Sequence, residues 1–136
     1  MTDTLTSEER SRRMALVRAV DTRPEMVVRR LIFGMGYRYR LHRRDLPGTP
    51  DLMFRSRRAV VFVHGCFWHR HEGCALARTP KSRVEFWKAK LDGNRDRDAR
   101  KLEALSQAGW RVCVVWECEL KDQGGLAERL RQFLDG

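Results

Sequence analysis

Residues 46–74 decide the fold of this chain, and they read LPGTPDLMFRSRRAVVFVHGCFWHRHEGC. The continuous apolar run AVVFV is typical of a strand that is buried on both faces. The segment DLMF predicts a second, shorter strand, because Pro50 can begin a strand but cannot lie inside a central one. The polar turn RSRR joins the two segments and predicts an antiparallel hairpin. Such pairing places Asp51, which begins one strand, and His64, which ends the other, at the same edge of the sheet.

The carboxylate of Asp51 is a candidate Mg²⁺ ligand at this edge, because hard cations prefer oxygen ligands. A Pro-Asp pair that precedes the end of a hydrophobic strand resembles the PD-(D/E)xK nucleases, in which a metal helps to hydrolyse phosphodiesters. The second acid and the lysine of that motif would fall near Val63 and Gly65, so Val63 offers only its backbone carbonyl to a metal. The acid–base role then passes to His64 and His69, because imidazole titrates near neutral pH. The alternative is that Asp51 only caps the start of a strand.

Three potential metal ligands follow within nine residues. Cys66, His71 and Cys74 have the spacing C-x4-H-x2-C, and thiolate and imidazole ligands suit a tetrahedral zinc ion. A structural site needs a fourth ligand, for which we expect Cys118, because it follows a strand and can turn back toward the loop. Cys113 lies in the middle of the apolar segment WRVCVVW and has the character of a buried side chain. Disulfide bonds are the alternative, but no feature marks the chain as secreted.

Phe67 and Trp68 lie between these ligands, and two interpretations of the pair stay open. A loop held by zinc has little room to bury both rings, although the rings can form a small local core beneath it. Apolar side chains of this kind also enter the base stack of kinked DNA. The pair is therefore a candidate wedge for duplex DNA.

The blocks PGTPDLMF and VHGCFWHRH resemble the very-short-patch-repair (Vsr) endonucleases, and HGCFWHxH is highly distinctive. The similarity extends to EFWKAKLDGNRDRDARK and GWRVCVVWECEL, so that it covers roughly residues 6–120. The resemblance implies an enzyme with a structural zinc that uses Mg²⁺ to nick one DNA strand on the 5′ side of the thymine in a T:G mismatch. Such a mismatch arises from deaminated 5-methylcytosine, and the nick starts very short patch repair. The alternatives are a related nuclease with another DNA target and a zinc-stabilised DNA-binding module without catalysis.

The resemblance also implies roles for individual residues. Asp51 and the backbone carbonyl of Val63 match the family's Mg²⁺ ligands, and Glu25 matches an acidic residue that supports the site. His69 is our candidate for activating water, with His64 in support. The zinc loop segment HEGC is one residue longer than we expect, which predicts an altered loop. The remaining matches are the zinc ligands Cys66, His71, Cys74 and Cys118 and the intercalating aromatic residues Phe67, Trp68 and Trp87.

Composition narrows the class of partner. The chain has 136 residues, which suits one domain, and its 28 Lys and Arg against 18 Asp and Glu give a net charge of +10. This charge predicts an anionic partner, with nucleic acid first and an anionic membrane as the alternative. No apolar run approaches the ~20 residues of a membrane span and no signal peptide is evident, so we expect a cytoplasmic, nucleoid-associated monomer. By resemblance, mismatch-repair proteins and a repair polymerase are further candidate partners.

The N-terminal part of the sequence predicts an arm and a helix. Residues 1–5 show no ordered pattern, and residues 6–9 resemble a capping box that begins an arginine-rich helix. This pattern makes residues 1–20 a candidate arm that contacts DNA phosphates. A second capping box, with proline in its first turn, spans residues 22–25 and begins another helix. Glu25 therefore has a second interpretation, as a plain capping carboxylate.

The other elements are shorter or lie toward the C-terminus. Residues 37–41 alternate aromatic and arginine side chains and predict an edge strand, followed by His42 as a loop or phosphate-contact residue. Ser82 is expected to cap a long helix in which Phe86 packs into the core and Trp87 faces DNA. A second buried strand, WRVCVVW, and a final amphipathic helix follow a glycine that ends the long helix.

The order of these elements predicts an α/β fold with three layers, in which helices flank a mixed central sheet. The resemblance implies the restriction-endonuclease-like version of this fold, with an added structural zinc loop. We expect residues 1–136 to form one such domain.

Overall fold

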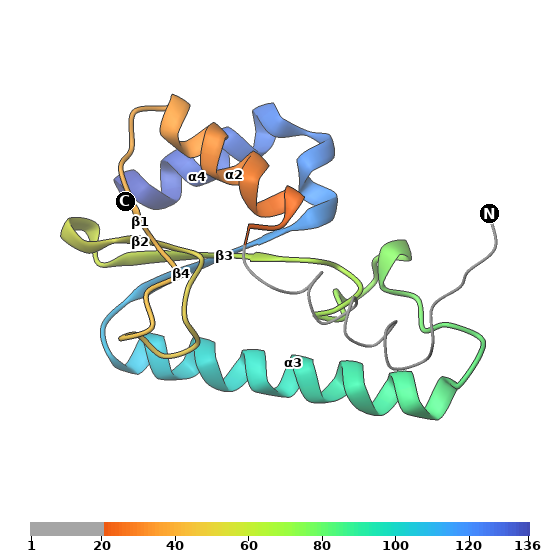
Figure 1. The fold of residues 1–136 in the computed structure, drawn as a ribbon. Coiled ribbons are helices and arrows are strands. Elements are labelled where there is room, and N and C mark those ends of the chain that lie inside the picture. Colours follow the sequence, from red (N-terminus) through yellow and green to blue (C-terminus); the bar gives the residue numbers. More distant parts are fainter. Residues whose placement is uncertain (1–20) are drawn as a thin grey trace.

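The computed structural model describes residues 21–136, which form a four-stranded mixed sheet with helices on both faces (Figure 1). The strands lie across the sheet in the order β1 (Arg40–Leu41), β2 (Leu52–Phe54), β3 (Ala59–His64) and β4 (Arg111–Trp116). The pairs β1–β2 and β2–β3 are antiparallel, whereas β3 and β4 are parallel. The predicted hairpin is therefore present as β2 and β3, which the short 3-10 turn η1 (Arg55–Arg57) connects.

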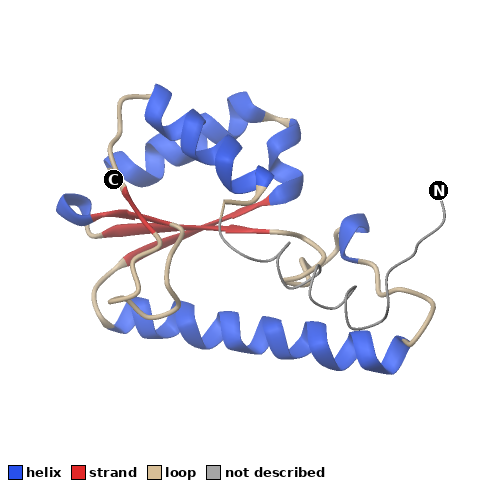
Figure 2. Ribbon diagram, viewed as in Figure 1, coloured by secondary structure: helices blue, strands red, loops and turns tan. Residues whose placement is uncertain are grey.

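Helices cover the two faces of the sheet, as Figure 2 shows. α2 (Arg23–Gly34) and α4 (Gln123–Asp135) lie together on one face, and α3 (Val84–Gln107) runs along the other. The predicted three-layer α/β fold with a mixed central sheet is confirmed. The arm and the helix predicted within residues 1–20 lie outside the described residues.

Two apolar cores hold the layers together, one on each face of the sheet. Along β3, Ala59 and Val61 belong to the core beneath α2 and α4, whereas Val60 and Phe62 belong to the core above α3. This alternation follows from the two-residue repeat of a strand, and it explains why the run is apolar throughout. Burying each large aliphatic side chain contributes about 1.5–3 kcal/mol. The helices contribute Val28 and Ile32 from α2, Leu105 from α3, and Leu126, Leu130 and Leu134 from α4.

α2 begins and ends as the sequence predicts. The side chain of Thr22 accepts a hydrogen bond from the backbone N–H of Glu25 at 3.4 Å, and Pro24 lies in the first turn. The helix ends at Gly34, and Gly36 has a φ of 98°, which glycine adopts at little cost. The N-terminal cap by Thr22 fixes the first turn of α2, which carries Glu25.

The predictions for two strands need correction. The edge strand predicted over residues 37–41 is only two residues long, because its partner β2 has three residues and pairs through Met53 and Leu52 alone. β4 is not buried on both faces: Cys113 and Val115 are buried, while their neighbours along the strand are partly exposed. The reason is that β4 is the outer strand of the described sheet, next to β3 only.

The start of α3 also differs from the prediction. Ser82 does not cap the helix, because the N-cap is Arg83, which has a φ of 54° and makes no side-chain capping bond. Phe86 is not in the core but is 46% exposed, and its ring lies beneath the guanidinium of Arg83. Helical spacing explains this exposure, because Trp87 lies one turn before the buried Leu91, whereas Phe86 does not.

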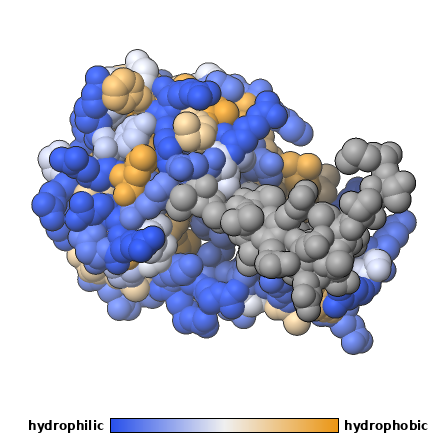
Figure 3. Space-filling view, viewed as in Figure 1, coloured by the Kyte–Doolittle hydropathy of each residue, from blue (hydrophilic) through white to orange (hydrophobic). Residues whose placement is uncertain are grey.

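The face of the molecule in Figure 3 is mostly hydrophilic, with separate hydrophobic spots. This agrees with the net charge of +10. Over residues 21–136, no helix has the length and apolar character that crossing a membrane requires.

Candidate active site and metal cluster

A cleft of about 650 Å³ opens where β2 begins and β3 ends. Its walls come from the N-terminus of α2, the loop before β2, the segment after β3 and one side of α3. The cleft is lined by seven of the residues that the sequence predicts for the site: Glu25, Asp51, Val63, His64, Phe67, Trp68 and His69.

Asp51 lies at the start of β2 and faces the end of β3. One of its carboxylate oxygens, Oδ2, accepts a hydrogen bond from the backbone N–H of Val63 at 2.7 Å. Burial raises the pKa of Asp51 to about 7; the Val63 N–H opposes this shift, and the nearby carboxylate of Glu25 adds to it. A buried carboxyl group beside a second one favours the approach of a cation.

Asp51→Asn is expected to stabilise the protein at alkaline pH when no magnesium is added. Folding raises the pKa of Asp51 from 3.8 to about 7, so the folded state loses stability as the pH rises through this window. Asparagine removes the charge and keeps an oxygen that can accept from Val63. We expect a melting temperature about 4 °C higher above the window and no gain below it. Melting curves at a pH below the window and at a pH above it check this prediction. An equal rise in melting temperature at both pH values would contradict it.

Glu25 is only 2% exposed and is tied to several charged groups. Its Oε2 lies 2.9 Å from Nε2 of His42, and it forms an ion pair with Arg29. Arg29 also pairs with Asp21 at 2.5 Å. A hydrogen bond between the side chains of Glu25 and Asp51 contributes to the raised pKa of Asp51. Glu25 is thus a buried acidic partner of Asp51, in addition to its place in the first turn of α2.

His42 is a site residue that the sequence analysis assigned to a loop. Leu41 pairs with Leu52 in antiparallel register, which places His42 beside Asp51. The backbone N–H of His42 donates to the carbonyl oxygen of Asp51 at 3.2 Å. The sequence could have indicated this position. In an antiparallel pair, the residue that follows one strand lies opposite the residue that precedes the other, so His42 after β1 meets Asp51 before β2.

His64 and His69 stack face to face, with ring centroids 3.8 Å apart and ring planes 6° from parallel. His64 ends β3 and is buried; burial and the proximity of His69 lower its pKa to about 3, so it is neutral at neutral pH. Nδ1 of His69 lies 2.5 Å from a carboxylate oxygen of Asp98. The other ring nitrogen of His69, Nε2, is therefore the one left for proton transfer.

Asp98 is a second site residue that the sequence analysis missed. It lies on α3 and lines the cleft. The buried residues Leu91, Asn94 and Leu105 share its side of the helix. Asn94 also donates to the backbone carbonyl of Trp68 at 3.0 Å, which ties the aromatic segment to α3. The sequence could have indicated Asp98, because it is an acidic residue on the same side of the helix as the buried residues, whereas the rest of the helix is mostly exposed.

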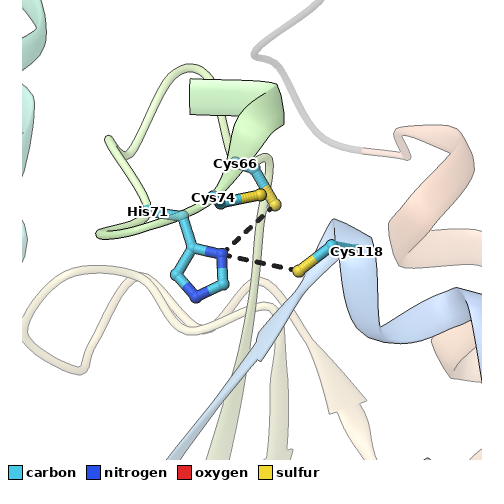
Figure 4. Close-up of side chains that lie close together, drawn as sticks. All are labelled: Cys66, His71, Cys74 and Cys118. Atoms are coloured by element: carbon cyan, nitrogen blue, oxygen red, sulfur yellow. Dashed lines mark hydrogen bonds between the residues drawn. The ribbon is translucent and has the colours of Figure 1, made fainter. Parts of the chain in front are cut away.

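A separate cluster of thiol and imidazole groups lies beyond the end of β3. Figure 4 shows the side chains of Cys66, His71, Cys74 and Cys118 pointing toward one another, and their donor atoms all lie within 4.8 Å. Nδ1 of His71 is 3.6 Å from Sγ of Cys66 and 3.5 Å from Sγ of Cys118. Tetrahedral zinc with Zn–S of about 2.3 Å and Zn–N of about 2.0 Å requires a nitrogen–sulfur distance of about 3.5 Å. The four residues could therefore hold zinc.

The segment between His71 and Cys74 forms a turn. The backbone N–H of Cys74 donates to the carbonyl of His71 at 3.3 Å, and Gly73 has a φ of 73°, which suits glycine. Cys113 lies elsewhere, in the core beneath α2 and α4, where Arg129 donates to its sulfur at 3.2 Å. All four cysteines lie within the described residues, and none of them forms a disulfide bond.

Phe67, Trp68 and Trp87 form an aromatic cluster at the cleft. Their ring centroids are 5.0 to 6.0 Å apart, and the planes are steeply inclined. Phe86 extends the cluster by an edge-to-face contact with Trp87 at 5.3 Å. The rings of Phe67, Trp68 and Trp87 are all partly exposed. The cluster therefore has the packing of a local core and also presents aromatic surface to a ligand.

Known proteins resemble this chain along most of its length. A family model described as DNA mismatch endonuclease Vsr matches residues 2–76. The Type II nicking enzyme V.XorIIP of Xanthomonas oryzae is 58% identical over 135 residues, covering 99% of this chain and 98% of that protein. The Type II nicking enzyme V.NmeAIP of Neisseria meningitidis is 40% identical, covering 98% and 95%. The DNA mismatch endonuclease Vsr of Escherichia coli is 38% identical, covering 100% and 90%.

The fold, the cleft and these matches define a DNA endonuclease. The chain belongs to the Vsr family of DNA mismatch endonucleases. Membership of a nuclease family implies the use of a divalent metal ion, and the structure contains groups of residues that could hold one.

Proposed function

We propose that the protein nicks one strand of duplex DNA on the 5′ side of the thymine in a T:G mismatch, by Mg²⁺-dependent hydrolysis of the phosphodiester bond. The nick would start very short patch repair of deaminated 5-methylcytosine. The observation that carries the proposal is the convergence of two pairs of residues in one cleft. Asp51 with Glu25 and His69 with Asp98 both line it, next to the aromatic cluster.

Asp51 and the backbone carbonyl of Val63 are the proposed Mg²⁺ ligands. The donor set fits a hard cation, because Asp51 is a carboxylate beside the second carboxylate of Glu25. A magnesium ion bound there would polarise the phosphate and help to generate the nucleophile from water. Glu25 supports the site by keeping Asp51 in a negative environment, and its own ion pair with Arg29 holds it in place.

His69 is the proposed group that takes the proton of the attacking water or relays it. Its Nδ1 is held by Asp98, an arrangement that fixes one tautomer and the orientation of the ring. His64 is buried and, with its lowered pKa, stays neutral, so it is poorly suited to supply a proton. The face-to-face contact with His64 instead keeps the ring of His69 in one orientation.

Zinc has a structural role in this proposal. Cys66, His71, Cys74 and Cys118 would hold the loop on which both His69 and the wedge residues lie. The wedge consists of Phe67, Trp68 and Trp87, and these rings would enter the base stack beside the mismatch. We propose further that residues 1–20 contact DNA, that the domain acts as a monomer near the nucleoid, and that mismatch-repair proteins and a repair polymerase follow it.

A cleavage assay with three duplexes tests the proposal. The duplexes share their flanking sequence and carry a T:G mismatch, a matched pair or a branch. We expect nicking of the T:G duplex only, 5′ to the thymine, and only when Mg²⁺ is present. Equal cleavage of the matched or branched duplex would indicate a nuclease with another target. Binding to all three without cleavage would indicate a DNA-binding module. Randomised flanks in the T:G duplex then give the preferred sequence context.

Trp68→Ala is expected to weaken binding to a T:G duplex by about tenfold while changing the affinity for matched DNA less. Stacking of an aromatic side chain on a base is worth about 1–3 kcal/mol, and unstacking costs less at a mismatched pair. Mismatch-dependent nicking should fall with the affinity. Binding titrations on both duplexes measure the ratio.

Phe33→Ala is the control for this variant, because Phe33 is 51% exposed and lies outside the cleft. It should leave both affinities unchanged. If Trp68 serves only the local core, Trp68→Ala lowers the melting temperature and reduces both affinities equally. If the ratio of the affinities for T:G and matched duplexes does not change, residues other than Trp68 discriminate between the two duplexes.

A further inference from the structure

Trp116 lies between the proposed active site and the zinc cluster. It ends β4 and pairs in register with His64, which ends β3. Its ring stacks on the imidazole of His71, with centroids 4.1 Å apart and planes 7° from parallel. The same ring meets His64 edge to face, at 5.2 Å and 77°.

These contacts join four rings in one series. His71 of the zinc cluster contacts Trp116, Trp116 contacts His64, and His64 stacks on His69. Close-packed side chains cannot move independently, so a displacement of one ring is passed to the next. The series therefore links the zinc ligands to the proposed base by direct contact, in addition to the loop that connects them along the chain.

The position of Trp116 does not follow from a need for core packing. Within residues 21–136, it belongs to neither of the two apolar cores. The two residues after it also serve the zinc loop. The carboxylate of Glu117 accepts a hydrogen bond from the backbone N–H of Cys66 at 3.3 Å, and Cys118 is the fourth member of the metal cluster. The end of β4 thus supports this loop at three successive residues.

We infer that Trp116 is a positioning residue, which sets the place of His64, and through it of His69, relative to the zinc cluster. The inference rests on the proposed function only in taking His69 as the base. It predicts that the zinc site influences catalysis through the Trp116 ring, although zinc has no part in the chemistry.

Replacement of Trp116 separates this role from general stability. In Trp116→Leu that retains zinc, the ring-proton resonances of His69, which stacks on His64 rather than on Trp116, should shift. Single-turnover nicking should slow by about a hundredfold, the cost of misplacing a catalytic group by about 1 Å. Affinity for the duplex should stay within about twofold, because the wedge is unchanged. Trp116→Phe keeps an aromatic ring and should recover most of the rate.

Trp110→Leu is the matched control, because Trp110 directly precedes β4, at the end opposite Trp116, and lies beneath the guanidinium of Arg58. It should leave the histidine resonances in place. Unchanged resonances of His69 in zinc-loaded Trp116→Leu would overturn the inference. The resonances decide this question even if the protein fails to nick T:G DNA, so the two proposals fail separately.

A second measurement needs no substitution and decides the question if Trp116→Leu loses zinc. Cadmium replaces zinc in the intact chain and forms longer bonds to sulfur, which displaces His71 slightly. The indole N–H resonance of Trp116 and the ring protons of His64 and His69 should then move together, while the indole of Trp110 stays in place. Movement of the histidines without Trp116, or no movement of either, would refute the proposed link.

Discussion

Asp51→Asn is expected to lower the single-turnover rate of nicking by at least about a thousandfold, while binding to the T:G duplex stays largely intact. Removing a group that stabilises charge in a transition state costs roughly two to three orders of magnitude, and loss of the proposed Mg²⁺ ligand should cost more. The substitution keeps the size of the side chain and an oxygen that can accept from the backbone of Val63. Rates under saturating enzyme and separate binding titrations distinguish catalysis from affinity.

The control for this variant is Asp45→Asn, because Asp45 is an exposed acid that pairs with Arg43 at 2.9 Å and does not line the cleft. It should nick at the normal rate. Activity of Asp51→Asn within tenfold of the unchanged protein would remove Asp51 from the metal site, and the other carboxylates of the cleft, such as Glu25 and Asp98, would then be the candidates.

Cys118→Ser is expected to release zinc and to lower the melting temperature by more than about 10 °C. Structural zinc contributes folding free energy directly, because the site does not exist in the unfolded chain. A loss of several kcal/mol corresponds to a shift of this size in a domain of this length. The unchanged protein should hold one zinc ion per chain. Elemental analysis and melting curves on the same preparations measure both effects.

Cys113→Ala is the matched control, since it removes a thiol from the same segment of chain but from the apolar core. We expect it to keep one zinc ion and to cost about 1 kcal/mol, as a small core truncation does. Zinc lost from Cys113→Ala and kept by Cys118→Ser would reverse the assignment of the fourth ligand.

The sequence predicts the sheet well where a sequence pattern is compatible with only one structure. The run AVVFV can be apolar throughout only if both faces of β3 are covered, and the structure covers them with two cores. The hairpin follows from a polar turn between two apolar segments, and its register brings Asp51 against Val63. Local spacing in the sequence is enough for both inferences, because the interacting residues belong to neighbouring strands.

Residues of the site that come from distant elements were harder to find. His42 depends on the length of β1, which only its pairing with β2 determines. Asp98 depends on which side of a 24-residue helix faces the sheet, and the charged composition of α3 hides that side. Phe86 was misplaced for the same reason, since a shift of one residue on a helix rotates a side chain by about 100°.

The parallel pairing of β3 with β4 has a consequence for the order in which the protein matures. Parallel neighbours need a long crossover, here the whole of α3, so β4 joins the sheet only after most of the chain has been synthesised. A nascent chain that ends before Trp116 already carries Asp51 and His69 but lacks Trp116 and Glu117, which contact the loop, and Cys118, the proposed fourth zinc ligand. Under the proposed function, we therefore expect that a chain cannot cut DNA until its synthesis is nearly finished.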